Sequence, residues 1–361
     1  MKRHLQQGSL VAFFAIVIVA LAACNPIKPA PPPTPDPLVG KTVIASGLRQ
    51  PRQIMYGNDG TLYVAENGIG GNSHITTTAT NTVASGLSAQ ITAVTPDGKQ
   101  AVVLAGLPSV ANEPSGEDFF GAQGIYVTAD ALWVALGYGP ELKGRALPFT
   151  ANLMEFDRTT WRIKNVVDLW SAAVQNSQPS SDAPFSNPAD IAAAADGSLY
   201  IADASCNCLW NWNENEGLKL LAAWTIEDNP VPTGVAIGPD GDIYVSFLSS
   251  FPFKTGSARI ERWSGGTLKQ TYAGLTMLTD VLVTPANRIF AVQFAEFGEK
   301  GPQAGSGKVL EITASGPKDV MTGLTGPFAL ALSPDNKLVV SVGAAGDTSG
   351  HGAVILVDGY R

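Results

Sequence analysis

The chain has 361 residues, of which only 15% are charged, and 31 acidic residues outnumber 23 basic ones for a net charge of −8. No cluster of lysine or arginine runs along it, which disfavours nucleic-acid binding, since proteins of that class carry a basic patch. The 38 glycines and 25 prolines are typical of many short strands joined by turns, so the composition favours an all-β fold.

The first residues are typical of a secretory signal peptide. Lys2 and Arg3 precede an apolar run over residues 10–23 that ends in small side chains. The run is shorter than the about 20 residues that a membrane-spanning helix needs, and polar, proline-rich sequence follows it. We therefore expect residues 1–23 to be removed as a signal peptide.

The residues before the first cysteine, Leu21-Ala22-Ala23-Cys24, resemble the bacterial lipobox. The resemblance implies that Cys24 receives a diacylglycerol and holds the chain on a membrane, because two or three acyl chains anchor stably where one does not. An ordinary signal peptide with a chance cysteine is the alternative. Residues 24–40 hold seven prolines and are expected to form a semi-rigid tether. The expected location is the bacterial cell envelope, exported and membrane-anchored.

Residues 41–361 contain one unit six times, which predicts a single six-bladed β-propeller of four strands per blade. The clearest copy, residues 232–245, has a proline-led strand, an Asp-Gly turn and a second strand, and Asp-Gly between apolar runs is a strong hairpin signal. The second strands of the six copies start at Leu62, Leu132, Leu199, Ile243, Ile289 and Leu338. Later copies recur at about 40–50 residues, the period of a propeller blade, and the first two intervals carry insertions.

The two ends of the repeat predict how the ring closes. The last copy stops after its third strand, residues 353–357, whereas residues 41–48 resemble a fourth strand without a blade of its own. We expect this N-terminal strand to complete the sixth blade and to cover an edge that would otherwise invite aggregation.

The inner strand of each blade begins at the central channel, so the two residues after its leading proline are expected to line the channel mouth. The residue that closes the second strand joins them. The candidate channel residues are Arg52, Gln53, Glu66, Gln123, Asn187, Asp190, Asp203, Asp280 and Gln293.

Four carboxylates among these residues suggest a site for a cation or a polar ligand. Calcium takes six to eight oxygen ligands, and the candidates to hold it are Asn187, Asp190, Asp203 and Asp280. In the plainer interpretation, Arg52 pairs with one carboxylate and channel waters satisfy the others.

Three further features leave alternatives open. Cys206 and Cys208 are two residues apart in a chain expected to be exported, so they form either a disulfide or two thiols without a role. The insertions over residues 67–90, 137–150 and 168–188 form either a binding surface or plain solvated loops. Trp210 and Trp212 face one side of a strand, where packing between blades is a simpler explanation than carbohydrate stacking.

Several stretches resemble the bacterial ScyD/ScyE family, which is related to NHL-type propellers. Residues 231–260 carry most of the resemblance, with Gly47 to Arg52, Ser186-Asn187-Pro188 and Ala202-Asp203-Ala204 in support. The resemblance implies a six-bladed propeller over about residues 41–358 and carries no established catalytic residues. Gly121-Ala122-Gln123-Gly124 stands where the family pattern leads us to expect a His and an Asp.

A wider resemblance runs to calcium-dependent gluconolactonase-like propellers, in which an Asn of a Ser-Asn-Gly motif ligates the metal. Ser186-Asn187-Pro188 is similar, with Pro188 in place of the glycine.

These observations favour a non-catalytic, lipid-anchored propeller that binds a small molecule, glycan or protein on one face. The alternative is a calcium-dependent lactonase or hydrolase with its site at the channel, where a metal-bound water would be the nucleophile. A quinoprotein dehydrogenase ranks third.

Overall fold

The structure is a computed structural model that describes residues 38–72, 74–77, 82–113, 119–137, 148–176, 186–225, 227–344 and 351–360. Chain contacts divide the protein into residues 1–36 and residues 37–361, and every described residue belongs to the second unit. The predicted signal peptide, Cys24 and nearly all of the tether lie outside the described residues. So do most of the insertion over residues 137–150 and parts of the other two.

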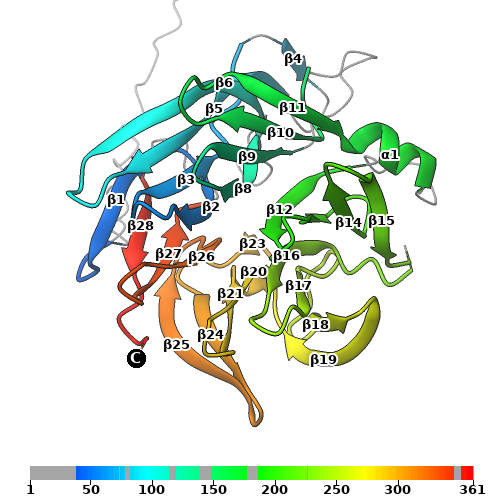
Figure 1. The fold of residues 1–361 in the computed structure, drawn as a ribbon. Coiled ribbons are helices and arrows are strands. Elements are labelled where there is room, and N and C mark those ends of the chain that lie inside the picture. Colours follow the sequence, from blue (N-terminus) through cyan, green and yellow to red (C-terminus); the bar gives the residue numbers. More distant parts are fainter. Residues whose placement is uncertain are drawn as a thin grey trace, which may run out of the picture. The chain divides into compact units, whose positions relative to one another are not determined.

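The second unit is a six-bladed β-propeller, as predicted, with six antiparallel sheets around a central axis (Figure 1). Blades 1 and 2 consist of β2 (Pro51–Tyr56), β3 (Leu62–Glu66), β5 (Thr82–Val94) and β6 (Gln100–Glu113), then β8 (Ala122–Val127), β9 (Ala131–Leu136), β10 (Asn152–Asp157) and β11 (Ile163–Asp168). Blades 3 and 4 consist of β12 (Pro188–Ala193), β13 (Leu199–Asp203), β14 (Cys208–Asn213) and β15 (Gly217–Ala223), then β16 (Pro232–Ile237), β17 (Ile243–Phe247), β18 (Ala258–Ser264) and β19 (Thr267–Leu275).

Blades 5 and 6 complete the ring. They consist of β20 (Leu278–Val283), β21 (Ile289–Gln293), β24 (Gly307–Thr313) and β25 (Gly316–Leu324), then β26 (Leu330–Leu332), β27 (Leu338–Val342), β28 (Gly352–Leu356) and β1 (Val43–Leu48). Four short strands are additions to this pattern: β4 (His74–Thr77), β7 (Phe119–Phe120), β22 (Phe297–Gly298) and β23 (Gly301–Pro302).

The turn between the first and second strands of each blade explains why the repeat can be recognised in the sequence. Gly60, Gly197 and Gly241 stand at positive φ in three of these turns, where a side chain would be strained. Asn287 and Asn336 take the same conformation in two others, at φ 59° each. Asparagine is the side chain that tolerates this region best, so the Asp-Gly signal fades there without a change in fold.

Large apolar side chains pack between neighbouring blades. Trp210 on β14 is 1% exposed and belongs to the core between blades 2 and 3. Trp212 stacks at 4.6 Å on Trp133 of β9, with a tilt of 55° between the rings. Both tryptophans therefore serve packing between blades, the simpler of the two interpretations.

A short helix, α1 (Leu169–Asn176), follows β11 in a segment that was expected to be an insertion loop. Asp168 caps it, because its carboxylate accepts hydrogen bonds from the Ser171 amide at 2.9 Å and the Ser171 hydroxyl at 2.6 Å. Leu169 and Ala173 bury one face of the helix. No helix within the described ranges is long and apolar enough to cross a membrane.

Ring closure follows the prediction, because β1 pairs antiparallel with β28 and becomes the fourth strand of blade 6. Ala45 and Leu48 of β1 are buried in the core shared with blade 1. The first strand of the propeller thus joins the two ends of the described chain.

A chain that starts at Arg49 should therefore lose soluble expression, because the edge of β28 and the core beneath Leu48 would be exposed. A chain that starts at Pro37 retains β1 and is the matched control. Soluble yield and size-exclusion profiles of the two chains measure the effect. A folded monomer from the shorter chain would contradict this account of closure.

Candidate functional site

The channel mouth is built from equivalent positions of the six inner strands, and their side chains alternate around the axis. Blades 1, 3 and 5 present Gln53, Asp190 and Asp280, whereas blades 2, 4 and 6 present Gly124, Gly234 and Ala329. The small residues allow close approach: a Cβ on Gly124 would lie 2.8 Å from the Cα of Asp190, and one on Gly234 would lie 2.8 Å from the Cα of Asp280. Asp190 and Asp280 can therefore sit close to the preceding blade only because that blade has a glycine at the equivalent position.

Asp190 and Asp280 each bridge to the next blade. Asp190 accepts hydrogen bonds from its neighbouring amide, Ile191, at 2.7 Å and from the Val235 amide of blade 4 at 2.8 Å. Asp280 repeats this arrangement with Val281 at 2.8 Å and with Leu330 of blade 6 at 2.7 Å. Both side chains are almost fully buried. Their oxygens therefore hold inner strands together.

Threonines next to these positions add further ties between blades. The Thr233 hydroxyl donates to the Leu278 carbonyl at 2.9 Å, which joins blade 4 to blade 5. The Thr279 hydroxyl donates to the Phe328 carbonyl at 2.7 Å, which joins blade 5 to the segment that leads into β26 of blade 6.

Burial dominates the electrostatics of the two carboxyls. Desolvation raises the pKa of Asp190 to about 7. Desolvation and then the negative charge of Asp190 raise the pKa of Asp280 well above its ordinary value, although hydrogen bonds that include one from the Gln53 side chain act in the opposite direction. Two like charges in buried positions disfavour each other, so ionisation of one carboxyl opposes ionisation of the other.

Arg52 links blade 1 to blade 6 at the same level. Its guanidinium lies 4.4 Å from the centroid of the Phe328 ring, and its Nη1 donates to the Ala344 carbonyl at 2.5 Å. The Ser341 hydroxyl of β27 donates to the Arg52 carbonyl at 2.9 Å. Arg52 therefore contributes to ring closure between blades 1 and 6.

Glu66, at the end of β3, is fully buried within blade 1. One carboxylate oxygen accepts from the Arg49 amide at 2.6 Å, and the other accepts from Gln90 Nε2 at 2.9 Å and from the Thr92 hydroxyl. These donors fix the segment that enters the ring.

Asp203, at the end of β13, accepts four hydrogen bonds around a fully buried carboxylate. The donors are the Ser186 hydroxyl at 2.6 Å, the Asn187 amide at 2.7 Å, the Cys206 amide at 3.2 Å and the Trp210 indole at 3.2 Å. Burial raises the pKa of Asp203, and these four hydrogen bonds oppose that rise. Sequence reasoning placed Asp203 at the channel but did not identify Ser186 and Trp210 as its partners.

The remaining polar candidates are also engaged. Gln123 Nε2 donates to Asn187 Oδ1 at 2.6 Å, which joins blade 2 to blade 3. Gln293, at the end of β21, donates to the Ser306 carbonyl at 3.3 Å. Past Gln53, the channel becomes a cavity of about 270 Å³ that is lined mostly by apolar residues, with walls from all six inner strands. The polar groups therefore gather where the inner strands begin.

A disulfide joins Cys206, in the turn after β13, to Cys208, the first residue of β14. Their sulfurs and the Asp203 carboxylate lie within 4.8 Å of one another, as metal ligands would. A disulfide offers no thiolate, and every Asp203 oxygen already accepts two hydrogen bonds. This group therefore lacks the free donors of a metal site.

The same test applies to calcium at Asn187, Asp190, Asp203 and Asp280. Calcium takes six to eight free oxygen ligands around one point. Asp203 accepts two hydrogen bonds on each oxygen and has no acceptor site left. Within the described residues, Asp190, Asp203 and Asp280 do not come together as a group of three ligand atoms. This set does not fit calcium in the arrangement that the structure shows.

Comparison with known proteins establishes the fold. No protein-family model matches the sequence, and no curated protein matches it. A gluconolactonase from Xanthomonas campestris is 10% identical, with a TM-score of 0.53 over 87% of this chain and 88% of its own. A protein described as an oxidoreductase (glucose dehydrogenase) from Thermus thermophilus is 12% identical, with a TM-score of 0.54 over 87% and 98%. A luciferin-regenerating enzyme is 10% identical, with a TM-score of 0.51 over 88% and 93%. At these identities the likeness extends to the six-bladed ring alone.

The raised pKa of Asp190 predicts how stability depends on pH. The unfolded carboxyl ionises near its ordinary value of 3.8, whereas the folded one keeps its proton until about pH 7. The folded state thus binds the extra proton between these values, and its stability falls as the pH rises through that window, by a few kcal/mol at about 1.4 kcal/mol per pKa unit. We expect a higher melting temperature at pH 5 than at pH 8.

Asp190→Asn should flatten this dependence, because the substituted side chain does not ionise. It should also lower stability at pH 5, since its amide group cannot accept from a second backbone N–H. Asp97→Asn is the control, since the pKa of exposed Asp97 is lowered by Lys99 and Thr95. The test is the melting temperature of each variant at several pH values. If it depends on pH in Asp190→Asn as it does in the wild type, the dependence does not come from Asp190.

Proposed function

We propose that this protein is an exported, lipid-anchored six-bladed propeller that binds a small molecule, glycan or protein through the face on which its inner strands begin. Its partners are then the membrane, through the lipid on Cys24, and a ligand at the channel mouth, in the bacterial cell envelope. The signal-like residues 1–23, the lipobox-like Leu21-Ala22-Ala23-Cys24 and the proline-rich tether support the location.

The resemblance of residues 231–260 to the ScyD/ScyE family supports the same proposal. That family is related to NHL-type propellers. The resemblance implies a propeller fold and carries no established catalytic residues. The six-bladed ring agrees with this kind of protein.

One observation favours binding over hydrolysis: the axial carboxylates hold the blades together. A calcium-dependent lactonase would use oxygens such as those of Asp190 and Asp280 to hold a cation and activate a water. Here both side chains accept backbone amides of two neighbouring inner strands. If these oxygens coordinated a metal instead, the ring would lose the hydrogen bonds to Val235 and Leu330 that join neighbouring blades.

Lipidation is tested by labelling. Cells that express the full chain and are fed labelled palmitate should incorporate the label into the wild type, because acylation precedes cleavage at Cys24. Cys24→Ala should remain unlabelled and should leave the membrane fraction. Cys206→Ala is the control for label on another cysteine. Equal labelling of Cys24→Ala would overturn the anchor.

The role of the axial carboxylates is tested by calcium. Because their oxygens are engaged, we expect the melting temperature to be the same in excess calcium and in excess chelator. A site filled at 100 times its Kd would add about 2.7 kcal/mol to the unfolding free energy, which a melting curve resolves. A calcium-dependent rise that Asp190→Asn and Asp280→Asn both abolish would replace the binding proposal with the lactonase. A melting-temperature screen of small molecules and glycans then searches for the ligand.

A further inference from the structure

A second cavity, of about 280 Å³, lies over blade 4 and away from the axis. Its walls come from the loop between β17 and β18 and from the segment that leads into β16. The side chains that give it its chemistry are Asp228, Ser249, Phe251, Lys254, Ser257 and Arg259. None of them belongs to the channel mouth.

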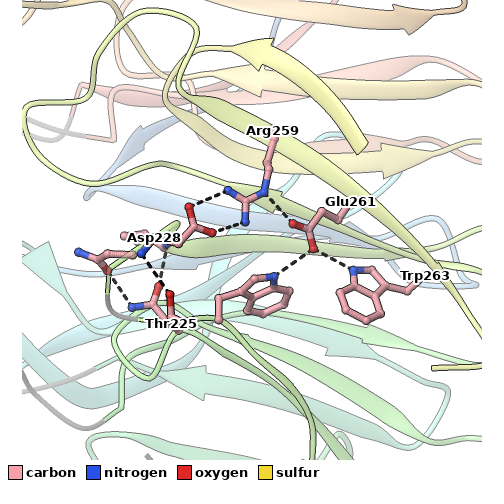
Figure 2. Close-up of polar contacts among 9 residues, drawn as sticks. Thr225, Asp228, Arg259, Glu261 and Trp263 are labelled. Atoms are coloured by element: carbon pink, nitrogen blue, oxygen red, sulfur yellow. Dashed lines mark hydrogen bonds and ion pairs between the residues drawn. The ribbon is translucent and has the colours of Figure 1, made fainter. Parts of the chain in front are cut away.

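Two of these side chains, Asp228 and Arg259, belong to a network of charges and indoles next to the pocket (Figure 2). Arg259 lies between two carboxylates, with Nη2 at 2.7 Å from Asp228 Oδ2 and Nε at 2.7 Å from Glu261 Oε1. Behind it, one oxygen of Glu261 accepts from the Trp224 indole at 3.0 Å and from the Trp263 indole at 3.1 Å. A change at Asp228 therefore reaches two tryptophans through Arg259 and Glu261.

One wall is an exposed aromatic ring held in a fixed pose. Phe251 is 74% exposed. Its ring meets Phe253 at 6.0 Å and Phe297 of β22 at 5.7 Å, both nearly edge-on. The loop that carries it is tied down, since the Ser249 amide donates to the Pro230 carbonyl at 2.8 Å. A preformed apolar face costs little ordering entropy when a ligand binds it.

The remaining groups offer hydrogen bonds without excess charge. The lining carries one anion, Asp228, and two cations, Lys254 and Arg259. Because Arg259 pairs with Asp228 and with Glu261 behind it, its charge is compensated and does not favour an anion in the pocket. The Asp228 side chain is 49% exposed and retains accepting capacity toward the pocket. The Ser257 hydroxyl donates to the Lys254 carbonyl at 2.6 Å and lies 3.0 Å from the Ser249 hydroxyl, so the Lys254 ammonium group is the main donor toward the pocket.

We propose that this pocket binds a neutral sugar, with the C–H face of the ring on Phe251 and hydroxyl groups on Asp228 and Lys254. An aromatic face beside a carboxylate, an ammonium group and hydroxyls matches a ring that is apolar on one face and rich in hydroxyls at its edge. The site lies off the axis, so it goes beyond the proposed function and does not depend on the calcium result.

The two partly buried indoles provide the readout. The mature protein is labelled with 5-fluorotryptophan, and the ¹⁹F resonances of Trp224 and Trp263 are assigned from Trp224→Phe and Trp263→Phe. Glucose, galactose and mannose are titrated one at a time. At least one of them should shift both resonances with a Kd on the order of 1 mM. Glucuronate and inorganic sulfate are the charged probes.

Three variants sharpen the result. Phe251→Ala should weaken sugar binding at least about tenfold, or roughly 1.4 kcal/mol, because the stacking face is lost. Asp228→Asn should weaken it to a similar degree, since one oxygen acceptor becomes a donor. Phe149→Ala removes another exposed phenylalanine from a segment outside this pocket and should bind as the wild type does. Melting temperatures show whether each variant is folded.

Any of three results would overturn the proposal. The first is a shift with glucuronate or sulfate alone that Lys254→Gln or added salt removes, which would make the pocket an anion site. The second is no shift with any neutral sugar up to roughly tens of millimolar, where a site with a millimolar Kd would be nearly filled. Unweakened sugar binding by Phe251→Ala would likewise exclude this pocket.

Discussion

Two carboxylates near the propeller axis, each shared between neighbouring blades, are the interaction on which the ring depends. Adjacent blades meet face to face and share no backbone ladder, so their inner strands need other ties. Asp190 and Asp280 supply them by accepting the amides of Val235 and Leu330. Hydrogen bonds to charged groups contribute about 1.5–3 kcal/mol each, but burial of the charge offsets part of this gain. The stability of the ring therefore depends on whether the carboxyls of Asp190 and Asp280 are protonated.

This dependence changes how the polar channel is understood. Acidic residues at equivalent positions of the six repeats suggest a metal site. Here, however, their oxygens already accept hydrogen bonds from donors of the protein. Asp203 is the clearest case, because its four donors come from three different segments. A cluster of carboxylates in a propeller can thus be structural throughout. The pocket of blade 4 differs, since Asp228 is partly exposed beside an exposed ring.

Much of the fold was predictable from local signals. Asp-Gly turns marked three of the blades, and the incomplete last copy together with residues 41–48 predicted closure by β1. The site was less accessible, because the partners of Glu66 and Asp203 depend on which segments the ring brings together. Asp168, three residues before Ser171, was a capping signal for α1 that was not used. Phe251-Pro252-Phe253 supported the family resemblance but was not used to locate a site, although it places two aromatics in a loop between strands.

The alternation of Gln53, Gly124, Asp190, Gly234, Asp280 and Ala329 gives the ring a parity. Blades 1, 3 and 5 carry a large polar side chain at this position, and blades 2, 4 and 6 carry a small one. A Cβ on Gly124 or Gly234 would have no space against the next strand. Loss of a single blade would bring two polar or two small positions together at the seam. Removal of two neighbouring blades, by contrast, would leave large polar and small residues alternating across the new seam.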